Sequence, residues 1–85
     1  MAYQMGRVQT LDEIGRRLGF RDAAGLSDAI GLSGDVTTLV TQVERSYHEA
    51  HRRVQPEDVM TFDEYARVCI VDALRARGYH IPTSP

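Results

Sequence analysis

The chain has 85 residues, enough for one domain with a small core. Hydrophobic residues make up 42% and charged residues 26%, an ordinary globular composition that argues against intrinsic disorder. The net charge is −2 and all ten basic residues are arginines, so no excess of positive charge marks the whole chain as a nucleic-acid binder.

The compartment can be predicted from what the sequence lacks. No apolar run approaches the roughly 20 residues that a membrane span needs, and residues 1–7 show no secretory signal. Cys69 is the single cysteine, whereas small secreted domains usually depend on several disulfides. We therefore expect a cytoplasmic protein without a membrane partner. The use of arginine without lysine suggests a bacterium or phage with GC-rich codons as its source.

The first helix is expected to begin at Thr10, after a loose N-terminal arm over residues 1–9. Thr10 and Glu13 have the spacing of a capping box, in which two side chains satisfy free backbone N–H groups at a helix start. Leu11, Ile14 and Leu18 then fall on one face. A glycine follows at position 19, where a left-handed conformation can end the helix.

Asp22 can cap a short second helix that carries Leu26 and Ile30 and ends at Gly31. Ser33 or Asp35 can open a third, longer helix that continues to Pro56. Its apolar residues recur in steps of three and four, as one helical face requires. They are Val36, Val40, Val43, Tyr47, Ala50 and Val54. The β-branched residues of 36–43 also suit a strand, but they do not alternate, so the helix is favoured.

A second capping box, Thr61 and Glu64, predicts the start of a fourth helix that ends near Gly78. Residues 79–85 are expected to form an extended C-terminal tail. The predicted fold is therefore all-α: a compact array of about four helices, two short and two long, with residues 10–78 as the core of one domain. The apolar face of the fourth helix comprises Phe62, Tyr65, Ala66, Cys69, Ile70, Ala73 and Leu74.

Residues 11–30 resemble a helix-turn-helix. Residues 11–20 resemble its first helix and turn, and residues 19–22 with Leu26, Ser27 and Ile30 resemble the equivalent stretch of AraC-type regulators. The resemblance covers about twenty of 85 residues and implies a DNA-binding regulator that reads DNA through the second helix. Arg21, Ser27, Arg16 and Arg17 are the residues that would contact DNA on this alternative.

The chemistry of this second helix does not favour DNA. Base edges are read mainly by Arg, Lys, Asn and Gln, but this helix offers Ala23, Ala24, Gly25, Ser27 and Asp28. Four arginines also follow an acidic residue by four positions, which favours local ion pairs over phosphate contacts. These pairs are Asp12–Arg16, Glu13–Arg17, Glu49–Arg53 and Asp63–Arg67. Nucleic acid is thus a disfavoured partner.

Reactive chemistry is sparse along the chain. Glu44, His48 and His51 share one helical face and are the only weak candidates for metal ligands. They lack a fourth ligand and the histidine spacing of a zinc protease, so neither a metal nor another cofactor is predicted. Cys69 lies on an apolar helix face and is expected to be a core residue rather than a nucleophile. We therefore expect a protein that is not an enzyme.

The fourth helix is apolar on more than one side. Val68 and Val71 lie away from its main apolar face, among Glu64, Arg67 and Arg75. Four helices of this size rarely surround one of their number completely, so a second contact is expected around Val68, Val71 and Tyr79. The function predicted from the sequence is a small protein-binding or regulatory protein that also forms a homodimer; the alternative is the DNA-binding regulator.

Overall fold

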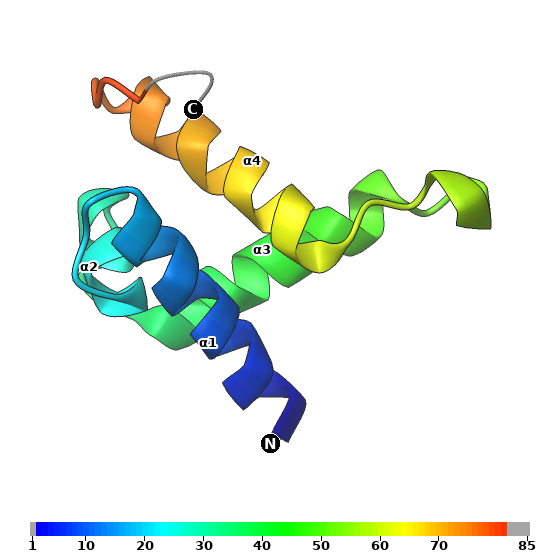
Figure 1. The fold of residues 1–85 in the computed structure, drawn as a ribbon, viewed down its shortest axis with the longest axis horizontal. Coiled ribbons are helices and arrows are strands. Elements are labelled where there is room, and N and C mark those ends of the chain that lie inside the picture. Colours follow the sequence, from blue (N-terminus) through cyan, green and yellow to red (C-terminus); the bar gives the residue numbers. More distant parts are fainter. Residues whose placement is uncertain (1, 82–85) are drawn as a thin grey trace.

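A computed structural model describes the backbone of residues 2–81 and the side chains of residues 6–81. Four α-helices and one 3₁₀ turn follow one another without a strand in this range (Figure 1). The all-α prediction is confirmed. The elements are α1 (Ala2–Arg17), α2 (Ala23–Ala29), α3 (Val36–Ala50), η1 (Pro56–Asp58) and α4 (Phe62–Ala76).

The predicted N-terminal arm is wrong, because α1 already begins at Ala2. Thr10 does not cap this helix; its hydroxyl donates to the carbonyl of Gly6, one turn earlier and 3.1 Å away. Val8 packs on the core, so tertiary contact supports the extra turns. Consequently three helices are long and only α2 is short, rather than two of each.

Helices α1 and α2 form a tight corner. A Cβ atom at Gly15 would lie 2.9 Å from the Asp22 carbonyl oxygen and 3.2 Å from Leu26 Cγ, so only glycine permits this approach. Asp12 accepts a hydrogen bond from the Ala23 N–H at 2.7 Å. Asp22 caps α2 as predicted, accepting from the Gly25 N–H. The corner is therefore fixed by packing and by two carboxylates.

Residues 36–43 are helical, which confirms the favoured alternative for α3. Asp35 is the N-cap and accepts from both the backbone and the hydroxyl of Thr38. The Thr38 backbone bond first, and then its hydroxyl bond, lower the pKa of Asp35 below its ordinary value. The helix ends at Ala50 with His51 as its C-cap, rather than continuing to Pro56. Val54 therefore lies outside α3 and is exposed.

Thr61 caps α4 as predicted, but the reciprocal bond of a capping box is replaced by a bond between the two side chains. Thr61 accepts from the Glu64 N–H at 3.2 Å, and its hydroxyl donates to the Glu64 carboxylate at 3.0 Å. From this start α4 buries one stripe against the other helices. The core residues of all four helices are Leu11, Ile14, Ala23, Leu26, Leu39, Val40, Val43, Phe62, Ala66, Ile70 and Leu74.

Helix α4 ends near Gly78 as predicted, and Gly78 adopts a positive φ where the chain turns back. The Tyr79 ring meets the Phe20 ring edge-on, at 5.8 Å between centroids. Arg75 donates through Nε and Nη2 to the Ile81 carbonyl, at 3.2 and 2.7 Å. Residues 82–85 of the predicted tail lie outside the described residues. Within the described range, none of the helices combines the length and the apolar composition that crossing a bilayer requires.

Replacement of Gly15 by alanine should lower the free energy of unfolding by about 1–2 kcal/mol, because the new methyl group would displace the backbone of Asp22. Urea denaturation measures this. Gly6→Ala is the matched control on the same helix, because no part of the surrounding fold lies within 4 Å of where its methyl group would sit. It should raise the free energy of unfolding by about 0.5–1 kcal/mol. Equal effects at both positions would contradict the close approach.

The two threonines with identical capping-box spacing should respond differently to replacement by alanine. Thr61→Ala removes a true cap and should cost about 1 kcal/mol. Thr10→Ala should be neutral or stabilise by up to about 0.5 kcal/mol, because alanine is the better residue inside a helix. Thermal unfolding of both variants decides; a cost at Thr10 like that at Thr61 would mean that α1 begins at Thr10.

Candidate interaction surface

Helix α4 presents an apolar side chain directly away from the core. Its buried stripe consists of residues spaced by four, from Phe62 through Ala66 and Ile70 to Leu74. At about 100° per residue, Val68 lies on the opposite side of the helix from the middle of this stripe. Val68 is 50% exposed, the most exposed large hydrophobic residue described. Nothing in the described part of the fold covers it.

Three further residues share this side of α4. Glu64 is exposed, whereas Val71 and Arg75 are partly buried. We refer to Glu64, Val68, Val71 and Arg75 as the outer face of α4. Two valines at its centre and opposite charges at its ends give a small apolar patch with a polar rim, the usual layout of a protein contact.

Both charged ends of the outer face are held in place by the chain itself. The Glu64 carboxylate is tied to the Thr61 hydroxyl through one oxygen, Oε1. Arg75 is tied to the tail through Nε and Nη2. Among the described residues, Glu64 Oε2 and Arg75 Nη1 have no partner within the structure. These two atoms are available for a charge-assisted bond to another molecule.

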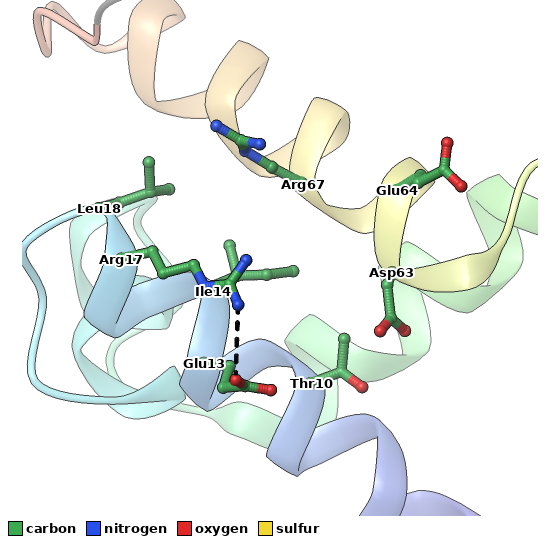
Figure 2. Close-up of a pocket in the computed structure, with 8 residues that line it drawn as sticks. All are labelled: Thr10, Glu13, Ile14, Arg17, Leu18, Asp63, Glu64 and Arg67. Carbon is green, nitrogen blue, oxygen red and sulfur yellow. Dashed lines mark ion pairs between the residues drawn. The ribbon is translucent and has the colours of Figure 1, made fainter. Parts of the chain in front are cut away.

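A notch of about 200 Å³ separates α1 from α4 beside the outer face. Figure 2 shows Arg17 reaching toward Glu13, with an ion pair at 3.8 Å, while Asp63 points toward α1 and Glu64 points away from it. Glu13 and Asp63 bring carboxylates to the notch and Arg17 and Arg67 bring guanidinium groups, so it is not selective for an anion. The lining residues are Thr10, Glu13, Ile14, Arg17, Leu18, Asp63, Glu64 and Arg67.

A smaller groove of about 170 Å³ lies on the other flank of α4, where Cys69 and Ala73 face Gln42 and Ser46 of α3. Ser46 and Tyr65 share a hydrogen bond of 2.7 Å between their hydroxyls. This bond favours the phenolate, but the contact with Cys69 and partial burial outweigh it and raise the pKa of Tyr65. Cys69 is only partly buried, and its polar neighbour is a protonated phenol rather than a base.

The three residues predicted to bind a partner are not all brought together. Val68 and Val71 share the outer face, but Tyr79 follows the end of α4 and packs on Phe20. Val68 lies eight residues before the last residue of α4, a separation of about 12 Å along the axis. Tyr79 is 42% exposed but is not part of the outer face.

The four residues expected to contact DNA lie in different surroundings and do not all face solvent. Ser27 is fully buried and its hydroxyl donates to the Asp35 carbonyl, so it is a structural residue and its assignment to a DNA surface is wrong. Arg17 forms the predicted pair with Glu13, and Arg21 lies 3.7 Å from Asp22. Arg16 is exposed, and Asp12, its predicted partner, instead accepts a hydrogen bond from the Ala23 N–H.

The weak metal candidates Glu44, His48 and His51 do not form a site. Glu44 pairs with Arg7 at 3.4 Å. His51 Nε2 accepts from the Met60 N–H at 3.3 Å, which requires the proton on Nδ1, 2.8 Å from the Tyr47 carbonyl. Both ring nitrogens are therefore engaged by the backbone. Across the described range, no three His, Cys, Asp or Glu side chains are placed to hold a metal ion.

Sequence analysis missed the role of Arg7. It joins three helices, pairing with Glu44 of α3 and lying 3.8 Å from the centroid of the Phe62 ring of α4. The signal was its spacing: Arg7 precedes Leu11 by four residues and Ile14 by seven, so it continues the apolar face of α1 backwards. The assumed arm over residues 1–9 concealed it.

Comparison with known proteins yields no relative from which a function could be transferred. The physical character of the outer face of α4, rather than kinship, is therefore the basis for a functional assignment. No protein-family model, no curated protein and no solved structure matches this chain.

Proposed function

We propose that this chain is a non-enzymatic binding module that docks another protein chain on the outer face of α4. The observation that carries the proposal is the half-exposed Val68, placed opposite the buried stripe of its helix. The helix is apolar on both sides, while the molecule measures only 33 × 32 × 20 Å and covers one side. Such a helix gains stability from a contact outside its own fold.

The polar surroundings support a binding role rather than catalysis. Three of the polar side chains that line the two hollows beside α4 have structural partners: Arg17 pairs with Glu13, Glu64 bonds to Thr61, and Ser46 bonds to Tyr65. Covering the exposed half of Val68 contributes about 1 kcal/mol. The charged ends of the outer face then select the partner and its orientation.

Val68→Asp should abolish partner binding without unfolding the protein. An aspartate at this exposed position places a charge at the centre of the contact but costs the free chain within about 0.5 kcal/mol. The measurement is quantitative affinity capture from cells that express the chain, with an untagged copy of the chain counted among the candidate partners. The captured amount of at least one protein should be at least tenfold lower with Val68→Asp than with wild type.

Val59→Asp is the matched control, since Val59 is 41% exposed and lies before α4, outside its outer face. It should retain the partner that Val68→Asp loses. If both variants capture the same proteins as wild type in equal amounts, the outer face is not a docking surface and the proposal fails.

A second candidate function, DNA binding, is favoured by one observation: the rigid corner of α1 and α2 carries the exposed Arg16, Arg17 and Arg21. On this alternative, the protein should retard duplex DNA in a gel at low salt and release it as salt rises, because phosphate contacts displace counterions. Arg16→Ala should weaken the retardation. No salt-sensitive retardation of any duplex would exclude this candidate.

A further inference from the structure

We infer that the partner of the outer face is a second copy of this chain, with the two α4 helices antiparallel. This inference rests on the proposed function and names the occupant of the same surface. The spacing of Glu64, Val68, Val71 and Arg75 carries it: the steps of four, three and four residues are those of a coiled-coil seam. In the described part of the chain, this seam lies on the side of α4 opposite the core, where Glu64 and Val68 are exposed and Val71 and Arg75 are partly buried.

The charges decide the direction of pairing. When the second helix runs in the opposite direction, Glu64 meets Arg75 of the second copy and Val68 meets Val71 of the second copy. A two-fold axis repeats each contact, so four valines pack between two ion pairs. A parallel arrangement would instead set Glu64 against its own equivalent and Arg75 against its own, and both contacts repel.

Glu64 and Arg75 each keep one polar atom with which they can form the ion pair between the two copies. Glu64 uses one carboxylate oxygen for Thr61 and keeps Oε2, while Arg75 uses Nε and Nη2 for Ile81 and keeps Nη1. Their existing bonds hold both side chains on the helix surface, which lowers the entropy lost on pairing. Glu64 already points away from the notch and α1 (Figure 2).

The size of the seam sets the expected affinity. Eleven residues separate its ends, or about 17 Å of helix. This is a short contact by the standards of permanent dimers. The dimer should therefore form reversibly, and its mass fraction should rise with protein concentration.

A charge exchange tests the pairing. Sedimentation equilibrium over a range of concentrations is measured for wild type, Glu64→Arg, Arg75→Glu and the double variant with both changes. Wild type should dimerise, and each single change should raise the dissociation constant at least tenfold, because it sets like charges together twice. The double variant should return to within about threefold of wild type, since it restores both pairs in reversed sense.

Thermal unfolding of each variant checks that the loss of dimer is not a loss of fold, since Glu64 and Arg75 also make bonds within the chain. Dimerisation that the double variant does not recover overturns the antiparallel pairing. A wild type that stays monomeric at every concentration overturns the inference as a whole. Capture of a different protein that Val68→Asp abolishes would still support the proposed function, so the two failures are distinguishable.

Discussion

The burial of one stripe of α4 is the constraint on which the rest of the structure depends. Phe62, Ala66, Ile70 and Leu74 close the core formed by the other helices, and each is at most 5% exposed. Among the described residues there are three other helices, and the core that they form covers α4 on one side. The small core therefore explains why this side of α4 is left open, but not why it carries valines.

Several side chains that suggest chemistry in the sequence turn out to hold helices together. Glu44 anchors Arg7, which in turn covers the ring of Phe62. His51 joins the end of α3 to the start of α4 through two backbone groups of opposite polarity. Its tautomer follows from those partners: an N–H can only donate and a carbonyl can only accept. These groups have structural partners that take up the atoms a ligand would need.

The corner of α1 and α2 has the close helix contact expected from the helix-turn-helix resemblance, but it does not expose every residue that was expected to contact DNA. Gly15 and the Asp12–Ala23 bond bring two helices together as a helix-turn-helix requires. However, Ser27, the polar residue of α2 that was expected to read DNA, is buried in the core. Its hydroxyl donates a hydrogen bond to the Asp35 carbonyl. In this small domain the corner also has a packing role, because α2 packs against both α1 and α3.

The sequence by itself determined the helical class, the caps at Asp22 and Thr61, and the main buried face of α4, because these depend on interactions within about four residues. It left the cap of α3 open between Ser33 and Asp35, and the structure shows Asp35. The sequence also pointed to Val68 and Val71, since helical spacing alone places them away from that face. It could not show that Thr10 lies inside a helix while Thr61 begins one, although their local sequences are alike. Tertiary contacts of Arg7 and Val8 decided this by stabilising the turns before Thr10. The burial of Ser27 and the position of Tyr79 were likewise decided by contacts between segments distant in the chain, which no local pattern encodes.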